Sequence, residues 1–511
     1  MSDTPVLRLT GITKRFGTLV ANDGITLSLS QGEVLALLGE NGAGKSTLVS
    51  ILFGHYVADT GTIEAFGQPL PPGNPRAALA AGIGMVHQHF TLADNLSVLD
   101  NVIIGTEPLW LLRSRRAEAR AKLIGVAERF GFSVQPDALI SSLSVGERQR
   151  VEILKALYRS ARILILDEPT AVLTPQESEA LFTSLSTMVK QGLSIIFISH
   201  KLPEVLRVSH RVAVLRQGKL VAQADAAHAT QARLAQWMVG HTVDDVARRP
   251  PRGSGQVLCE LDSVSTPAGE RDRLDRVSLA LHAGEIVAIA GVSGNGQVAL
   301  AEILCGMRGA ISGRVTLHGE PIVASPAWLV DRGVARIPED RHAVGVVGDL
   351  ALWENVVSER LRSKGFSRGS WVRRSTALRH AQHVIDTFDV RGAGLLSPAR
   401  SLSGGNMQKL ILGRALMSPA HLAEARPRVI VAHQPTWGLD IGAVAYVQER
   451  LLTARDAGAT VLLVSDDLDE VMALGDRIAV MHAGRLTVAK PAEQWTRESI
   501  GLAMAGVSHA A

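Results

Sequence analysis

Nine residues near the N-terminus, Gly39-Glu40-Asn41-Gly42-Ala43-Gly44-Lys45-Ser46-Thr47, carry the strongest structural signal in this chain. Apolar residues 34–38 precede them and mostly apolar residues 48–53 follow, which predicts a buried strand, a glycine-rich turn and a helix. The spacing matches G-x-x-x-x-G-K-[ST], the pattern of a phosphate-binding loop. Its glycines let several backbone N–H groups, backed by the positive end of the helix, face a phosphate. The pattern predicts that Lys45 reaches the β- and γ-phosphates of a nucleotide and that the Ser46 hydroxyl holds Mg²⁺.

The composition is that of a globular chain with room for several cores. Of 511 residues, 46% are hydrophobic and 20% are charged, and the length predicts about three domains. No apolar run approaches the roughly 18 residues that a membrane-spanning helix needs. The N-terminus lacks the basic and apolar regions of a signal peptide. We therefore expect a cytoplasmic protein.

The charge argues against a nucleic-acid-binding protein, and the cysteine content argues against a protein stabilised by disulfides or zinc. The net charge is only +4 and aromatic residues make up 4% of the chain, so few side chains could stack on bases, and we expect no nucleic-acid partner. The two cysteines, Cys259 and Cys305, fit neither a disulfide framework nor a zinc site. They are predicted to be ordinary interior residues.

Strands and helices alternate through the rest of the first half, and polar residues follow several strands. Apolar positions alternate over residues 6–30, which predicts antiparallel strands. Later apolar strands lead into polar residues, namely Gln88, the pair Asp167-Glu168, and His200. Because parallel strands end at one edge of a sheet, this pattern predicts an α/β parallel sheet with a ligand site at that edge.

Two other positions in this half have a specific prediction. Ser144 is followed three residues later by Glu147, which is the spacing of a helix capping box. Phe16 is a candidate to stack on a base, and the alternative is a half-buried strand aromatic.

The second half repeats the first. Gly291 corresponds to Gly39 at an offset of 252, residues 402–406 to residues 143–147 at 259, and His433 to Asp167 at 266. The landmarks follow the same order in both halves and their offsets change only slightly, which indicates an internal duplication. Between the halves, residues 247–255 are rich in Pro, Gly and Arg and read as a linker. We predict a first domain at 5–243, a linker at 244–256 and a second domain at 257–505.

Together these motifs resemble the tandem ATP-binding-cassette (ABC) ATPases, specifically those of the importers of simple sugars and nucleosides. Residues 85–90 and 171–177 look closest to the nucleoside-uptake branch. The resemblance covers essentially the whole chain. It implies two tandem P-loop NTPase cassettes, each with a parallel-sheet RecA-like core, an antiparallel β subdomain and a helical subdomain.

The resemblance also implies a role for each motif. Two cassettes close head to tail around ATP, so the phosphate loop of one half faces the signature turn of the other. Asp167 would hold Mg²⁺ through water, Glu168 would position or deprotonate the attacking water, Gln88 would sense metal and water, and His200 would contact the γ-phosphate. The remaining nucleotide contacts would come from Phe16, from residues 39–47, and from Ser403, Gly404, Gly405 and Asn406 of the second half. Each residue alone could instead be a solvated carboxylate, a loop histidine or a surface glutamine, and only the joint set favours the site.

The two halves are unequal. The second loop has Gln297 and Val298 in place of the lysine and hydroxyl, and its strand ends carry other substitutions. Those are His433 and Gln434 for Asp167 and Glu168, Asp466 for His200, and Glu339 for Gln88. The signature of the first half is interrupted by Val145 and Glu147, and Thr174 replaces the D-loop aspartate found as Asp440 in the second half. We predict one working ATPase site built from both halves and one degenerate site, where Glu147 adds a repelling charge.

The resemblance implies two integral-membrane permease subunits docked near the Gln88 and Glu339 loops, an extracytoplasmic substrate-binding protein, and a peripheral position on the cytoplasmic face of the membrane. The leading function is ATP-driven uptake of nucleosides, and the alternative is a simple sugar such as ribose or galactose. A soluble tandem ATPase acting on ribosomes or nucleic acid usually has two complete sites and a long charged linker, which this chain lacks. A regulatory module without turnover is opposed by the intact Lys45, Asp167 and Glu168 set.

Overall fold

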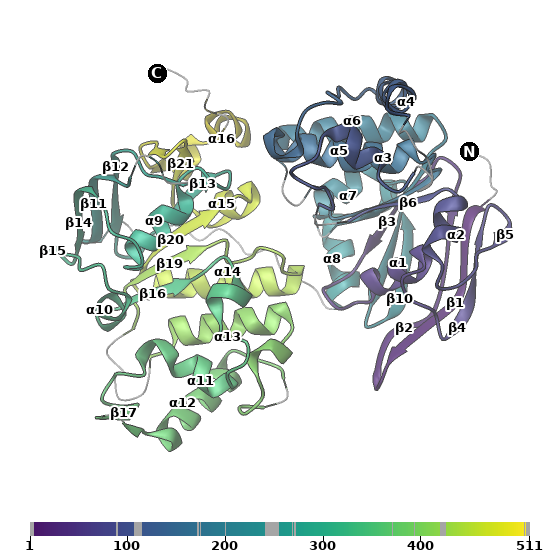
Figure 1. Cartoon of the computed structure of the whole chain (residues 1–511). Helices are drawn as coiled ribbons and strands as arrows, with labels where there is room; N and C mark the ends of the chain where they lie inside the picture. Colours follow the sequence, from purple (N-terminus) through teal and green to yellow (C-terminus); the bar gives the residue numbers. More distant parts are fainter. Residues whose placement is uncertain are drawn as a thin grey trace. The chain divides into compact units, whose positions relative to one another are not determined.

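The computed structural model describes residues 5–87, 90–106, 115–170, 173, 175–199, 201–240, 255–267, 269, 272–369, 371–392, 394–418, 426–504 and 506. The chain divides into two compact units, Met1–Val243 and Asp244–Ala511 (Figure 1). Each unit holds a mainly parallel sheet, a separate antiparallel sheet and a group of helices, which confirms the predicted α/β class. No helix among the described residues is both long and apolar enough to cross a membrane.

The core of the first unit is a six-stranded sheet in the order β10-β9-β3-β8-β7-β6. All neighbours pair in parallel except β10, which is antiparallel to β9. The strands are β3 (Val34–Leu38), β6 (Ile83–Val86), β7 (Ile163–Asp167), β8 (Ser194–Ile198), β9 (Arg211–Arg216) and β10 (Lys219–Asp225). Strands β3 and β8 are buried along their whole length, as their unbroken apolar sequences require of a sheet covered on both faces.

The register of this sheet aligns the ends of three of its strands. Ile198 of β8 pairs with Leu37 of β3 on one side and with Asp167 of β7 on the other. The ends of three adjacent strands therefore lie at one level, directly before the phosphate loop, the Asp167-Glu168 pair and the segment that leads to His200.

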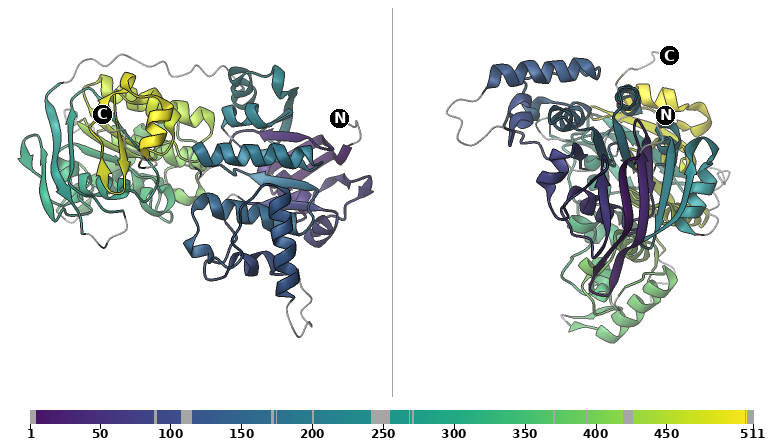
Figure 2. Two further views of the ribbon diagram at one scale, coloured as in Figure 1. Left: turned by 90° about the horizontal axis from the view of Figure 1, so that it is seen from above. Right: turned by 90° about the vertical axis from the view of Figure 1, so that its right-hand side faces the viewer.

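The antiparallel sheet of the first unit has the order β2-β1-β4-β5. Its strands are β1 (Pro5–Phe16), β2 (Leu19–Ser30), β4 (Thr60–Ala65) and β5 (Gln68–Pro69). The pairing of β1 with β2 confirms the antiparallel strands predicted over residues 6–30. Figure 2 shows these two long strands side by side.

Helices complete the first unit, and three of them form a group beyond the edge strand β6 (Figure 1). This group is α3 (Val98–Ile103), α4 (Arg116–Arg129) and α5 (Val145–Tyr158). The predicted capping box opens α5: the Ser144 hydroxyl accepts from the Glu147 N–H, and the Glu147 carboxylate accepts from the Ser144 N–H. The other helices are α1 (Lys45–Phe53), α2 (Pro75–Ala80), α6 (Pro175–Lys190), α7 (Leu202–Val208), α8 (Gln231–Val239), and the short turns η1 (Ile140–Ser142) and η2 (Ala226–His228).

The second unit repeats this topology. Its main sheet runs β16-β19-β20-β13-β21-β22, with β23 also paired to β21, and its antiparallel sheet runs β12-β11-β14-β15. The strands are β11 (Val257–Ser265), β12 (Val277–His282), β13 (Ile286–Gly291), β14 (Ser312–Leu317), β15 (Glu320–Pro321), β16 (Val334–Ile337), β19 (Val429–His433), β20 (Thr460–Ser465), β21 (Arg477–His482), β22 (Arg485–Leu486) and β23 (Lys490–Pro491), with a small hairpin of β17 (Ser367–Arg368) and β18 (Trp371–Val372). The motifs that the sequence repeats therefore lie at the ends of equivalent strands in the two units.

The helices of the second unit follow the same plan. They are α9 (Gln297–Leu304), α10 (Pro326–Asp331), α11 (Leu352–Val357), α12 (Arg374–Thr387), α13 (Gly404–Leu416), α14 (Ile441–Asp456), α15 (Leu468–Leu474) and α16 (Arg497–Met504), with short turns η3 (Arg341–Gly345), η4 (Ser358–Arg360), η5 (Ala399–Ser401) and η7 (Ala492–Gln494). Both cysteines are free and buried, as predicted. Burial raises the pKa of each thiol to about 12, so neither is a reactive thiolate at neutral pH.

Candidate nucleotide site

The first phosphate loop joins β3 to α1 and fits only glycine at two points. A Cβ at Gly39 would lie 2.4 Å from the Leu215 carbonyl oxygen, and one at Gly44 would lie 2.2 Å from that of Ala21. Both glycines have positive φ, 151° and 101°. The Asn22 amide donates to the Gly44 carbonyl oxygen at 3.1 Å and fixes the end of the loop. The backbone thus adopts the tight turn that the motif predicts.

Lys45 lies over this loop. Its Nζ donates to the carbonyl oxygens of Gly39 at 2.6 Å and Glu40 at 3.0 Å, so the ammonium group is held above the loop backbone. Ser46 follows in the first turn of α1 and is exposed to solvent. The loop therefore presents a cation, a hydroxyl and a helix N-terminus on one side, which is the donor set for a phosphate and its metal ion.

Asp167 and Glu168 end β7 opposite this loop. Burial and then the charge of Glu168 raise the pKa of Asp167, and Lys45 acts against that rise, which shows that the charges of the loop and the strand end interact. Glu168 has a left-handed backbone, with φ of 49°, and its N–H donates to the Ile198 carbonyl oxygen at 2.9 Å. A non-glycine residue in this conformation is uncommon and costs free energy, which the surrounding structure must offset.

Two predicted site residues, Gln88 and His200, lie outside the described residues, and so does Thr174. Their roles remain predictions. Phe16 ends β1 and is 44% exposed. Its ring lies 5.5 Å from that of Tyr56 in a T-shaped arrangement, and Lys14 Nζ lies 5.4 Å from its centroid. Stacking of a base on Phe16 stays a prediction.

The second loop keeps positive φ at Gly294 and Gly296, like Gly42 and Gly44 of the first loop, but its side chains differ. Gln297, only 1% exposed, donates from Nε2 to Asp466 at 3.2 Å, and Ser293 also approaches that carboxylate at 3.5 Å. Residue Asp466 as a whole is exposed, but desolvation of its carboxyl group and then the charge of Glu339 raise its pKa to about 6. The lysine position is thus taken by a neutral amide that bonds to an acid.

The strand end beside the second loop also differs. Burial lowers the pKa of His433 to about 4, so its ring is neutral at pH 7 and carries no charge opposite Glu339, 3.7 Å away. Gln434 has φ of 47° and its N–H donates to the Val464 carbonyl oxygen at 2.8 Å, which repeats the geometry of Glu168. The scaffold of a catalytic strand end is kept although the carboxylates are gone.

The two signature turns differ in the group that donates a hydrogen bond to the serine hydroxyl. In the second half, Ser403 precedes α13 and is exposed, and its hydroxyl accepts from the Asn406 amide at 2.9 Å. In the first half, the Glu147 side chain turns back on Ser144 in the capping box, and these hydrogen bonds lower the pKa of Glu147. Glu147 is therefore ionised at neutral pH.

Arg341 is a functional candidate that the sequence did not single out. Its Nη2 donates to the Trp437 carbonyl oxygen at 2.7 Å, next to the D-loop, and its guanidinium lies 3.9 Å from where a Cβ of Gly404 would be. Its Nη1 is buried without a hydrogen-bond partner among the described residues, and burial lowers the pKa of the group. Only the contacts across 96 residues of sequence reveal it.

The sequence matches known proteins over both units. The family described as ABC transporter matches residues 22–171 and 274–423, each segment holding one loop and one signature turn. The chain belongs to the ABC transporter family. This family member is 40% identical to the nucleoside import ATP-binding protein NupA of Lactococcus lactis subsp. cremoris, over 99% of both chains.

Two further relatives show the range of this ABC transporter group. The guanosine import ATP-binding protein NupO of Bacillus subtilis is 41% identical over 98% of this chain and 97% of its own. The glucose import ATP-binding protein TsgD13 of Haloferax volcanii is 41% identical over 99% of this chain and 96% of its own. The predicted resemblance to tandem ABC ATPases of sugar and nucleoside importers is confirmed.

Proposed function

We propose that this chain is the ATP-hydrolysing, energy-coupling subunit of an importer for nucleosides, bound peripherally at the cytoplasmic face of the membrane. The carrying observation is the first loop, where Lys45 lies above the backbone that would cradle phosphates and interacts with the carboxylate of Asp167. Transport of nucleosides is supported by the relatives NupA and NupO. Transport of a sugar, as the name of TsgD13 states for that protein, is the second candidate.

The donor set of the first loop fits Mg²⁺ with ATP. The Ser46 hydroxyl and the Asp167 carboxylate supply the oxygen ligands that Mg²⁺ prefers, one at the start of α1 and the other at the end of β7. Ser46 and Asp167 would hold the ion, which would supply positive charge against the phosphates. Lys45 would hold the terminal phosphates, Glu168 would orient the attacking water, and Gln88 and His200 would complete the set.

We propose further that the working site takes Ser403, Gly404, Gly405 and Asn406 from the second unit. The exposed Ser403 hydroxyl and the glycines after it can approach a phosphate closely. In the first unit, Glu147 carries a charge at the corresponding turn, which disfavours a phosphate there. The intact turn thus belongs with the intact loop.

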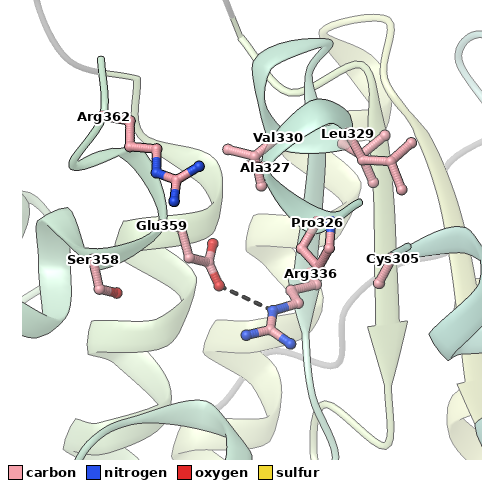
Figure 3. Close-up of a pocket in the computed structure, with 10 residues that line it drawn as sticks. Cys305, Pro326, Ala327, Leu329, Val330, Arg336, Ser358, Glu359 and Arg362 are labelled. Carbon is pink, nitrogen blue, oxygen red and sulfur yellow. Dashed lines mark hydrogen bonds and ion pairs between the residues drawn. The ribbon is translucent and has the colours of Figure 1, made fainter. Parts of the chain in front are cut away.

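A small cavity lies beside β16, the strand that leads to the Glu339 loop. Figure 3 shows this cavity, of about 170 Å³, between α10, β16 and residues 358–362. At its base Arg336 donates to Glu359 at 3.0 Å, and Arg414, almost fully buried, approaches the same carboxylate at 3.4 Å.

The function is tested by reconstituting the chain with the permeases encoded beside it in proteoliposomes. We expect uptake of a labelled nucleoside that requires ATP and is abolished by Lys45→Ala. Uptake of ribose or glucose but not nucleosides would select the sugar candidate. Co-purification with ribosomes and no permease-dependent uptake would contradict both.

A further inference from the structure

The second loop already holds a carboxylate at the start of its helix. Asp272 precedes β12 and has a left-handed backbone, with φ of 60°. One oxygen of its side chain accepts from the Gly296 N–H at 2.5 Å, and the other accepts from the Ala299 N–H at 2.8 Å. Both amides belong to the first turn of α9, so one side chain uses two of the donors that point out of this helix.

These two amides have counterparts in the intact loop. At the offset of 252 residues, Gly296 corresponds to Gly44 and Ala299 to Thr47. In a phosphate-binding loop, amides at the start of the helix face phosphate oxygens. The carboxylate of Asp272 therefore lies where a phosphate group would be bound, with the same charge sign and the same acceptor role. At the same offset the first unit has Val20, which offers no acceptor.

We propose that Asp272 excludes nucleotides from the second loop by occupying the amides that a nucleoside triphosphate would have to use. This makes Asp272 a specificity-determining residue that decides which of the two loops takes ATP. It acts in addition to the missing lysine. The inference relies on the proposed function only in treating the second loop as a relict of a phosphate loop.

The surrounding charges strengthen the exclusion. Burial and then the charge of Asp340 raise the pKa of Glu339, and the charge of Asp272 adds to that rise. Burial and then the charge of Glu339 raise the pKa of Asp466, so the carboxylates of Asp272, Glu339 and Asp466 interact around one loop. The neutral ring of His433 does not compensate for them. A triphosphate would have to displace one carboxylate from its donors and approach the other two, which like charges oppose.

The backbone that follows Asp272 is anchored by hydrogen bonds. The N–H of Leu274 donates to the Thr266 hydroxyl at 2.8 Å, and the Thr266 N–H donates to the Leu274 carbonyl oxygen at 3.1 Å. The N–H of Asp275 donates to the Gly484 carbonyl oxygen at 2.8 Å. These bonds help to keep the Asp272 carboxylate at the start of α9.

The test restores the second loop with and without Asp272. In full-length protein with Lys45→Ala, so that the first loop is silent, Gln297→Lys and Val298→Ser are introduced together, and MgATP binding is measured by titration calorimetry. We expect the further change Asp272→Ala to tighten binding by roughly ten- to a hundredfold, because two donors are released and one negative charge is removed. Asp275→Ala is the matched control, because Asp275 lies on the same segment but its carboxylate accepts from Arg485. This change should leave MgATP affinity equal to that of the variant with the restored second loop and Asp272 intact.

A second readout separates this inference from folding defects and from the proposed function. Without nucleotide, amide hydrogen exchange at Gly296 and Ala299 should be slow in the parent and faster after Asp272→Ala, while thermal melting reports whether the fold survives. Equal exchange rates, or equal ATP affinity with and without Asp272 in folded protein, would overturn the inference. If the parent protein showed no nucleoside transport but Asp272→Ala still changed ATP affinity and amide exchange as expected, only the proposed function would be contradicted.

Discussion

Lys45 of the first loop and Gln297 of the second loop occupy equivalent positions, but their side chains contact different groups. Lys45 Nζ bonds to loop carbonyl oxygens and leaves a positive charge over the loop, whereas Gln297 reaches across to Asp466. A single side chain thus decides whether the loop can stabilise charge that develops on a transferred phosphoryl group.

Replacement of Lys45 should therefore abolish turnover. We expect Lys45→Ala to lower kcat for ATP hydrolysis by about a hundredfold or more, because a charge that acts in the transition state is lost. Gln297→Ala, the mirrored change in the second loop, should retain most of the activity. Phosphate release by the two purified variants, with melting temperatures as a folding check, makes the comparison. Parent-like turnover by Lys45→Ala would contradict the proposed site.

Glu470 on α15 makes the stability of the second unit depend on pH. The residue is 2% exposed, and burial raises its pKa to about 7, although Ser465 donates to it at 2.6 Å. Between the unfolded value near 4.5 and about 7, the folded chain keeps a proton that the unfolded chain releases, so stability falls as pH rises. This shift corresponds to about 3 kcal/mol lost by pH 8.

Glu470→Gln should remove this part of the pH dependence. Urea unfolding of the variant at pH 8 should give a free energy of unfolding higher than the parent's by about 2–3 kcal/mol, with little or no advantage at pH 4.5. The half-buried carboxylate at the corresponding place of the first unit, Glu204, supplies the control Glu204→Gln. An advantage of the same size at both pH values would refute the explanation.

At the scale of elements, the signature turn before α13 and the D-loop before α14 are joined by Arg341 of η3. The guanidinium bonds to the Trp437 carbonyl oxygen and lies beside Gly404. Asp440 caps α14 by accepting from the Ala443 N–H at 2.9 Å. Three segments that are far apart in sequence are thus held in one arrangement, with Arg341 as a positioning residue.

Loss of this link should affect catalysis more than binding. We expect Arg341→Ala to lower kcat about tenfold with KM for ATP nearly unchanged, because in the proposed function the loop of the first unit binds ATP and the signature turn of the second unit contributes to turnover. Arg341→Lys should recover only part of kcat, since one ammonium group cannot replace the planar guanidinium. Arg368→Ala, at an exposed arginine of the same unit, is the control. A change in KM alone would argue against positioning.

At the scale of the whole molecule, the defects of the two units are complementary. The first unit has the intact loop and the altered signature turn, and the second has the reverse. With Glu168→Gln to block turnover, we expect one tightly bound MgATP per chain by equilibrium dialysis, and none when Lys45→Ala is added. Two bound molecules would contradict both the single working site and the role of Asp272.

The sequence by itself determined everything that depends on neighbours along the chain. The strand, loop and helix around Lys45 and the capping box from Ser144 to Glu147 follow from local pattern and spacing, because each is set by residues close together in sequence. The duplication follows from comparing motifs of the two halves along the printed sequence. Only the tertiary structure decided that Asp272 meets the amides of α9 across 24 residues, and that Arg341 reaches the D-loop across 96. Such contacts depend on how strands pair and where loops end in space, which no local spacing encodes.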